Sequence, residues 1–253
     1  MVPLNDDQMC RATDHIADRL FAALPSVSPY PPGVAPIPKL IDGLGFFPAG
    51  RGVWHRDPLV SPPPVPVGRV MVLGNNFGTE DYYAEAAVRQ ESPSNTTWRP
   101  LLATLHDAGV LASDCFFTNA FIGLIVGKSM TEQFPGLRDN AFVARCKQFL
   151  MEQMLLVQPR VLVVLGKEPA RLVAELSPDL RPWRTDFKFK VLDEAGFGLI
   201  RSAAFSFLSH QVNCVVLVHP CYPVNTRLRR FAGFQKREAE VEMLRAAVSE
   251  SHL

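Results

Sequence analysis

Short apolar runs alternate along the chain with segments in which apolar residues recur every three or four positions. After Gly68, the apolar runs predict strands at 69–73, about 114–121, 160–165 and 214–218. Helical spacing predicts helices at about 97–108, 139–156, 168–176 and 227–247. Apolar residues around 197–208 predict a hairpin or a strand-like excursion. Strands that alternate with helices predict a three-layer α/β/α fold around a central, mainly parallel four-stranded sheet.

The amino-terminal quarter has a different pattern. Residues 1–24 predict a helix that Pro25 ends, and residues 25–66 contain twelve of the 22 prolines, which favours an irregular arm. Because this arm also carries Phe46, Phe47 and Trp54, it is too apolar for a free linker and is expected to pack on the main domain, as cover for a sheet edge or as a lid over a pocket. We therefore divide the chain into an amino-terminal helix and proline-rich arm (1–68) and an α/β/α domain (69–253).

Composition limits the possible classes of protein. With 253 residues, 47 % of them hydrophobic and 20 % charged, the chain can bury one substantial core. No apolar run is long enough for a membrane span and the amino terminus is acidic, so a cytoplasmic location is expected. The five cysteines include no C-x-x-C pair, which favours reduced core thiols over a zinc or iron-sulfur site. We expect no cofactor and no metal.

A local basic patch stands out against the net charge of +1, which argues against a polybasic nucleic-acid binder. It consists of Arg227, Arg229, Arg230, Lys236 and Arg237. These side chains could hold phosphates, or they could simply form the solvated face of a helix.

Two apolar strands run directly into polar loops, at 70–78 (VMVLGNNFG) and 215–225 (VVLVHPCYPVN). In an open parallel sheet, ligands bind at the carboxyl ends of the strands, so the two loops are expected to converge on one site. The chain has no phosphate-binding G-x-x-x-x-G-K-[ST] loop, no G-x-S-x-G elbow and no H-E-x-x-H helix. Metal-independent chemistry is therefore expected.

These loops resemble the two motifs of the uracil-DNA glycosylase superfamily. The counterparts are Gly74-Asn75-Asn76-Phe77-Gly78 and His219-Pro220-Cys221, supported by Phe117-Thr118-Asn119 and by VLVVLGKEPAR at 161–171. Phe77 stands where many relatives have proline, and Cys221 replaces a serine. Asn76 is similar to the asparagine of the mismatch-type and single-strand-selective branches, and the iron-sulfur cysteine set is missing, so the branch is unassigned.

The resemblance implies a DNA glycosylase that hydrolyses the N-glycosidic bond of uracil or a related deaminated base in base excision repair. Asn76 and His219 are the expected catalytic residues: Asn76 would orient water and His219 would stabilise the leaving base. The expected substrate-binding residues are Gly74, Asn75, Phe77, Gly78 and Asn119, of which Asn119 reads the base. Alternative stacking partners are Tyr82, Tyr83 and Trp98, and Glu80 or Asp81 could activate water unless they merely form an acidic turn.

Contacts with DNA are expected from the second loop and the residues after it. A wedge that fills the gap left by the flipped base could be Tyr222, Val224 or Leu228, and Asn225 and Thr226 could bond phosphate or cap the final helix. The full expected DNA-binding set is Tyr222, Val224, Asn225, Arg227, Leu228, Arg229 and Arg230.

Two other functions stay open on the sequence. One is a non-catalytic member of the same fold that binds nucleic acid or a nucleotide. The other is a small-molecule nucleoside hydrolase whose pocket is closed by the arm around Trp54 and His55.

Overall fold

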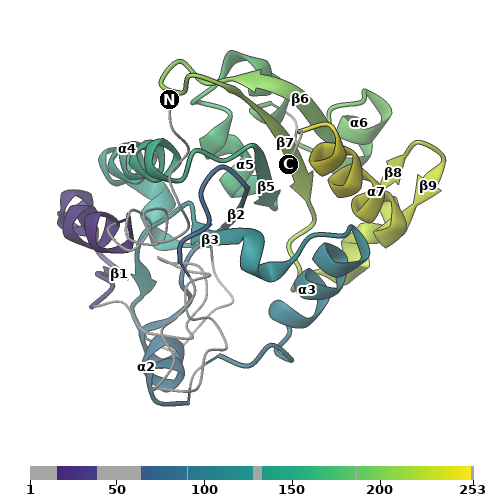
Figure 1. The fold of residues 1–253 in the computed structure, drawn as a ribbon. Helices are drawn as coiled ribbons and strands as arrows, with labels where there is room; N and C mark the ends of the chain where they lie inside the picture. Colours follow the sequence, from purple (N-terminus) through teal and green to yellow (C-terminus); the bar gives the residue numbers. More distant parts are fainter. Residues whose placement is uncertain (1–15, 39–63, 90, 128–132, 186, 252–253) are drawn as a thin grey trace.

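The structure is a computed structural model that describes residues 16–38, 64–89, 91–127, 133–185 and 187–251. One five-stranded sheet lies at its centre, in the order β3-β2-β5-β7-β6 (Figure 1). The strands are β3 (Cys115–Asn119), β2 (Val70–Gly74), β5 (Val161–Leu165), β7 (Gln211–Leu217) and β6 (Leu199–Ala204). The first four run parallel to one another, and β6 runs antiparallel to β7 at the edge.

The expected α/β/α class is confirmed, but the sheet has five strands instead of four. The additional strand, β6, comes from the apolar stretch around 197–208, where the sequence predicts either a hairpin or a strand-like excursion. Leu199 pairs with Val215, and the register shifts between Ile200 and Ala203. An antiparallel neighbour needs only the short turn between β6 and β7, whereas a parallel one would need a crossover helix.

The three layers follow from the burial of the strands on both faces. Every residue of β2, β3 and β5 is buried, as is typical of a parallel sheet covered on both sides. On one face, Met71 and Leu162 pack in a core with α4 (Asn140–Val157) and α5 (Lys167–Val173). On the other face, Val72 and Val163 pack with α3 (Trp98–Asp107) and α7 (Lys236–Ser249) (Figure 1).

Smaller elements connect these layers. The remaining helices are α2 (Glu80–Arg89), which directly follows the first loop and was not predicted, and α6 (Phe189–Glu194). Short 3-10 helices are η1 (Leu24–Val27), η2 (Ala112–Asp114), η3 (Pro135–Arg138), η4 (Pro178–Trp183) and η5 (Pro223–Leu228). Two antiparallel pairs of short strands are β1 (Val34–Ala35) with β4 (Leu124–Ile125), and β8 (Arg230–Phe231) with β9 (Phe234–Gln235).

The described part of the amino-terminal segment packs against α4, in the helical layer on one face of the sheet. Residues 16–23 are helical and lead into η1, and Leu20 and Val27 are fully buried in the core that contains α4. The guanidinium of Arg145 on α4 donates to the backbone carbonyl of Val27 at 2.8 Å. The expected lid or edge cover around Trp54 and His55 lies outside the described residues.

The final helix begins later than the sequence predicts. Residues 227–235 do not form its first turns, because η5 is followed by the β8–β9 hairpin and α7 starts only at Lys236. Ala232 (φ 49°) and Gly233 (φ 88°) form the tight turn of this hairpin, with the positive φ values that such turns require. Gln235 is the N-cap of α7, so the expectation that Asn225 or Thr226 caps this helix is wrong. None of the described helices is both long and apolar enough to cross a bilayer.

Candidate active site

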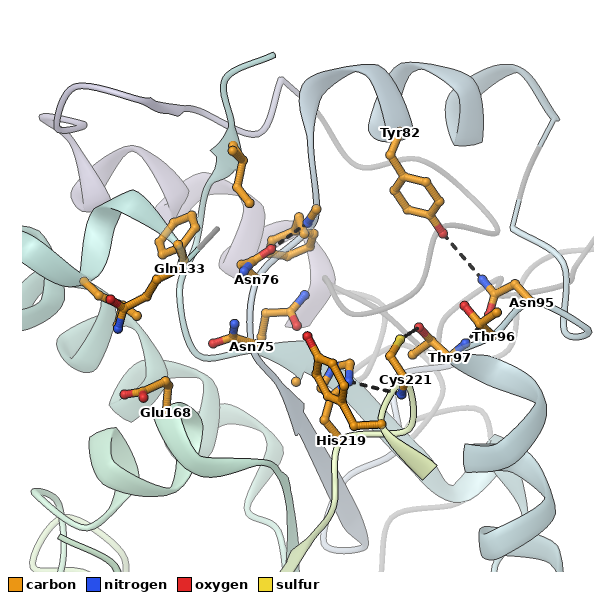
Figure 2. A pocket seen from close by; sticks show the side chains of 18 of the residues that line it. Asn75, Asn76, Tyr82, Asn95, Thr96, Thr97, Gln133, Glu168, His219 and Cys221 are labelled. Carbon is orange, nitrogen blue, oxygen red and sulfur yellow. Dashed lines mark hydrogen bonds between the residues drawn. The ribbon is translucent and has the colours of Figure 1, made fainter. Parts of the chain in front are cut away.

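A cavity of about 510 Å³ opens at the carboxyl ends of the parallel strands (Figure 2). The first loop contributes all five residues from Gly74 to Gly78, β3 contributes Asn119, and the second loop contributes His219, Cys221 and Tyr222. The structure thus brings both sequence motifs and the expected base-reading asparagine to one cavity, as the parallel topology predicts.

The first loop is held in a fixed conformation by hydrogen bonds at Gly78. Gly78 has φ 82°, a conformation that glycine adopts without strain, and its N–H donates to Oδ1 of Asn76 at 2.8 Å. Its carbonyl in turn accepts from the N–H of Ile125 at 2.8 Å. Phe77 packs in the core and also lines the cavity. The amide of Asn76 is therefore anchored at the cavity wall.

Two asparagine side chains on this wall each have a buried polar atom without a partner. Asn119 ends β3, pairs with Gly74 across the sheet and is only 2 % exposed. Among the residues that the structure describes, neither Nδ2 of Asn119 nor Oδ1 of Asn75 has a hydrogen-bond partner. An unpaired buried polar atom costs about 1–3 kcal/mol. Because both residues line the cavity, a ligand with a matching donor and acceptor would remove this cost.

His219 is held as a neutral imidazole. The N–H of Cys221 donates to its Nδ1 at 3.3 Å, so the single proton of the neutral ring lies on Nε2. Burial lowers the pKa of His219 to about 4, because a charged ring would lose its hydration. At neutral pH this side chain can therefore donate one hydrogen bond without carrying a charge.

The opposite wall contains residues that the sequence did not single out as a group. Tyr82 donates its hydroxyl to Glu91 at 2.5 Å, and the indole N–H of Trp98 donates to the same carboxylate at 2.8 Å. Oδ1 of Asn95 accepts from the N–H groups of Thr97 and Trp98, at 2.9 and 2.6 Å, at the start of α3. The only sequence signal here is the Ser-Asn-Thr-Thr stretch, which marks a helix start but not a cavity wall.

Several residues that the sequence offered as alternatives lie away from the cavity. Tyr83 and Trp98 are buried in the core and do not line it. Glu80 and Asp81 are exposed in the first turn of α2, where Glu80 accepts from the N–H of Gly127 at 3.3 Å. Their position corresponds to the acidic turn that the sequence also allowed.

The residues expected to contact DNA lie mostly on the surface beside the second loop. Tyr222 is 63 % exposed, and its ring centroid lies 6.0 Å from that of His219. Also exposed on or near η5 are Val224, Asn225, Arg227, Leu228 and Arg230. In the rest of the basic patch, Lys236 is exposed and Arg237 contacts Asp107 at 2.6 Å.

Arg229 is a correction to the expected DNA-binding set. Its side chain has no exposed surface, and its Nε lies 3.0 Å from Oδ2 of the equally buried Asp193. A charge run along the sequence cannot show that one of its members points inward, because that depends on the acidic partners that the fold supplies. Arg229 cannot reach a phosphate from this position.

The described cysteines and other possible metal ligands do not form a metal site. Cys115, Cys146 and Cys214 are buried thiols, and burial raises the pKa of Cys146 to about 12, whereas Cys221 is exposed. Within the described ranges, no three His, Cys, Asp or Glu side chains form a group that could hold a metal ion.

Comparison with known families agrees with the geometry of the cavity. The sequence model of the Uracil DNA glycosylase superfamily matches residues 66–244, which is more than half of the chain. The chain belongs to the uracil-DNA glycosylase superfamily. The range shared with this superfamily contains both loops and Asn119, and it begins where the proline-rich arm ends. No curated protein matches the chain.

Proposed function

We propose that this member of the uracil-DNA glycosylase superfamily hydrolyses the N-glycosidic bond of uracil or a related deaminated base in DNA, as a step of base excision repair. The observation that carries the proposal is the pairing, in one cavity, of a neutral His219 with the unpartnered amide atoms of Asn75 and Asn119. A flipped base has the donors, acceptors and size that such a cavity can accommodate.

His219 stabilises the departing base. When the bond between the base nitrogen and C1′ breaks, its electron pair stays on the base, and negative charge develops on the carbonyl oxygen next to that nitrogen. The Nε2–H of His219 donates a hydrogen bond to this oxygen, and the bond strengthens as the charge grows. Because Nδ1 accepts from Cys221, the single proton of the neutral ring lies on Nε2 and is available to this oxygen at neutral pH.

Asn76 positions the attacking water. Its Oδ1 accepts from the N–H of Gly78 and has a second lone pair for a water molecule. An amide can orient this water but cannot take its proton at neutral pH, so bond breakage to a cation-like sugar must come before the attack. The attacking water then gives its proton to the departed base anion, directly or through solvent. We therefore expect slower turnover than a carboxylate at this position would give.

Asn119 and Phe77 recognise the base. The free Nδ2–H of Asn119 donates to a carbonyl oxygen on the Watson–Crick edge of uracil, and the ring of Phe77 offers an apolar face at the cavity wall. Cytosine presents an amino group where uracil has a carbonyl, so this donor favours the deaminated base.

Strand contacts come from η5 and its neighbours. Tyr222, Val224 and Leu228 are the exposed apolar side chains available to fill the gap in the duplex. Arg227 and Arg230, together with Asn225, are exposed and available to phosphates.

Base release from oligonucleotides tests the proposal. Uracil-containing single strands and U·G duplexes are incubated with enzyme in EDTA, and abasic sites are detected by alkaline cleavage. We expect release by the wild type and release slower by about 10²-fold or more in Asn76→Ala and His219→Ala, with the residual rates measured in long incubations. Absence of release with tight, salt-sensitive DNA binding would instead support a non-catalytic binder. Absence of both activities would favour a small-molecule hydrolase, tested next with free nucleosides.

A further inference from the structure

A buried ionic cluster lies behind the second loop, and the mechanism above does not use it. It consists of Arg229 at the end of η5, Asp193 on α6 and Glu240 on α7. Arg229 and Asp193 have no exposed side-chain surface and Glu240 has 6 %. Burying three charged groups is costly, and well-packed apolar side chains often stabilise a protein as well or better. Stability alone therefore does not account for this cluster, and its contacts indicate a further role.

Glu240 bonds the backbone next to the catalytic histidine. Its Oε1 accepts from the N–H of Val218 at 2.6 Å, and Val218 directly precedes His219. This N–H follows the last residue of β7, where the sheet no longer supplies a partner. The carboxylate thus fixes the chain at the point where it leaves the sheet and enters the cavity.

Arg229 fixes the other end of the same loop. Its Nη2 donates to the carbonyl of Val216 at 2.9 Å, so residues 216 and 229 are joined across the base of the loop. Its Nη1 lies 3.5 Å from Oε1 of Glu240, and its guanidinium lies 4.5 Å from the ring centroid of Phe189. Arg229 therefore also positions the carboxylate of Glu240.

The charges that face Glu240 come from several elements. Burial raises the pKa of Glu240 to about 7, and the nearby Asp193 adds to the rise, while Arg229, the hydrogen bond from the N–H of Val218 and Arg237 favour the ionised form. Its Oε1 accepts from an amide N–H, and a neutral carboxyl or amide group also has an acceptor oxygen. The bond to Val218 can therefore persist without the charge, provided that this oxygen keeps its position.

We propose that Glu240 is a positioning residue for His219, holding the backbone of Val218 so that Nε2 of the histidine faces the leaving base. This inference rests on the glycosylase function proposed above. Displacement of a reacting group by about 1 Å can cost about 10²-fold in rate, so a single backbone hydrogen bond at this point has a large effect.

Two conservative variants separate position from charge. Glu240→Gln removes the charge but keeps an oxygen at the same distance along the side chain. Glu240→Asp keeps the charge but withdraws the oxygen by one methylene. We expect single-turnover base release to be little changed in Glu240→Gln and at least about tenfold slower in Glu240→Asp, with similar DNA affinity in both. The reverse order of rates would overturn the proposal, as would equal rates.

A double-mutant cycle tests whether the effect passes through His219. In a His219→Ala background, the rates of the Gln and Asp variants should agree within about twofold, because the group being positioned is absent. A difference that persists there would mean that Glu240 acts by another route. Asp193→Asn is a matched control from the same cluster that does not contact Val218, and its rate should be close to that of the wild type.

NMR of the His219 imidazole gives a readout that does not need activity. In the wild type and in Glu240→Gln, the ring should titrate near the same low pKa of about 4 and carry its proton on Nε2. In Glu240→Asp, the pKa should move toward the ordinary value of 6.5 and both tautomers should appear. An inactive wild type with these NMR shifts would contradict only the glycosylase function. Unchanged His219 signals in Glu240→Asp would contradict the positioning role.

Discussion

The hydroxyl oxygen of Thr97 lies 3.0 Å from the sulfur of Cys221, although 124 positions separate them in the sequence. This contact joins the start of α3 to the loop after β7, and both residues line the cavity (Figure 2). The contact thus connects the two walls of the cavity at Cys221, the residue that directly follows His219-Pro220.

Alkylation of Cys221 should abolish the proposed base release. Cys221 is exposed at the cavity, whereas Cys115, Cys146 and Cys214 are buried, so N-ethylmaleimide should react first with Cys221. The adduct would fill the space beside His219. Base release and adduct mass are measured in a Cys10→Ser background, because Cys10 lies outside the described residues. Cys221→Ser keeps a hydroxyl for Thr97 and should resist the reagent; equal inactivation of this variant would contradict the assignment.

Asn76→Asp should accelerate base release. A carboxylate can accept the N–H of Gly78 as the amide does, and it can also accept the proton of the attacking water. Positioned general bases contribute about 10²–10⁴-fold, and an unoptimised one should still give about tenfold in the single-turnover rate. Asn76→Ala should be slower than the wild type. If Asp and Ala were equally slow, Asn76 would not face the water.

Asn119→Asp should weaken selection for uracil. The change replaces the unpartnered donor Nδ2 with an acceptor of nearly the same shape, so the carbonyl oxygen of uracil loses its partner. Loss of a hydrogen bond to a buried polar group costs about 1–3 kcal/mol, or roughly 10- to 10²-fold in rate. Release is compared on uracil- and cytosine-containing strands. A uracil rate equal to that of the wild type would show that another group reads the base.

Base release should be insensitive to His219 ionisation from about pH 5.5 to 8, because its pKa is lowered to about 4. The free energy of unfolding, in contrast, should depend on the ionisation of His219. Between about pH 4 and 6.5 the unfolded chain binds a proton at this histidine that the folded chain does not, so the contribution of His219 to stability falls as the pH falls through this window. Thermal melts of wild type and His219→Asn, compared from pH 4 to 7, measure this difference. A constant difference would contradict the lowered pKa.

Alanine substitution should affect stability at Arg229 and DNA binding at Arg227, although the two residues are only two positions apart. Arg229→Ala leaves Asp193 and Glu240 buried without their cation and should lower the free energy of unfolding by about 3–5 kcal/mol. Arg227→Ala removes an exposed charge, and should reduce the salt slope of DNA binding by about 1 with little change in stability. Denaturant titrations and DNA affinity at several salt concentrations distinguish the two. A destabilised Arg227→Ala would mean that its side chain has a structural role.

Much of the fold can be predicted from the local pattern of apolar residues in the sequence. The continuous apolar runs at 70–73 and 161–165 are buried on both faces, as parallel strands require. Between them, α3 and α4 begin and end within a few residues of the expected positions, whereas α2 was not predicted. The carboxy-terminal region is less predictable. Residues 227–235 have the composition of a helix, but the turn at Ala232 and Gly233 and the burial of Arg229 give a hairpin instead.

The sequence by itself determined the α/β/α class and the two loops of the cavity, because strand burial and loop position depend on patterns within a few residues. Parallel strands share one carboxyl edge, so the convergence of Asn76, Asn119 and His219 also followed from the order of elements. Only the tertiary structure decided that Arg229 points inward, that Glu240 bonds the backbone of Val218 and that Thr97 reaches Cys221. These are contacts between residues distant in sequence, and they depend on which side chains the packed helices bring within hydrogen-bonding distance.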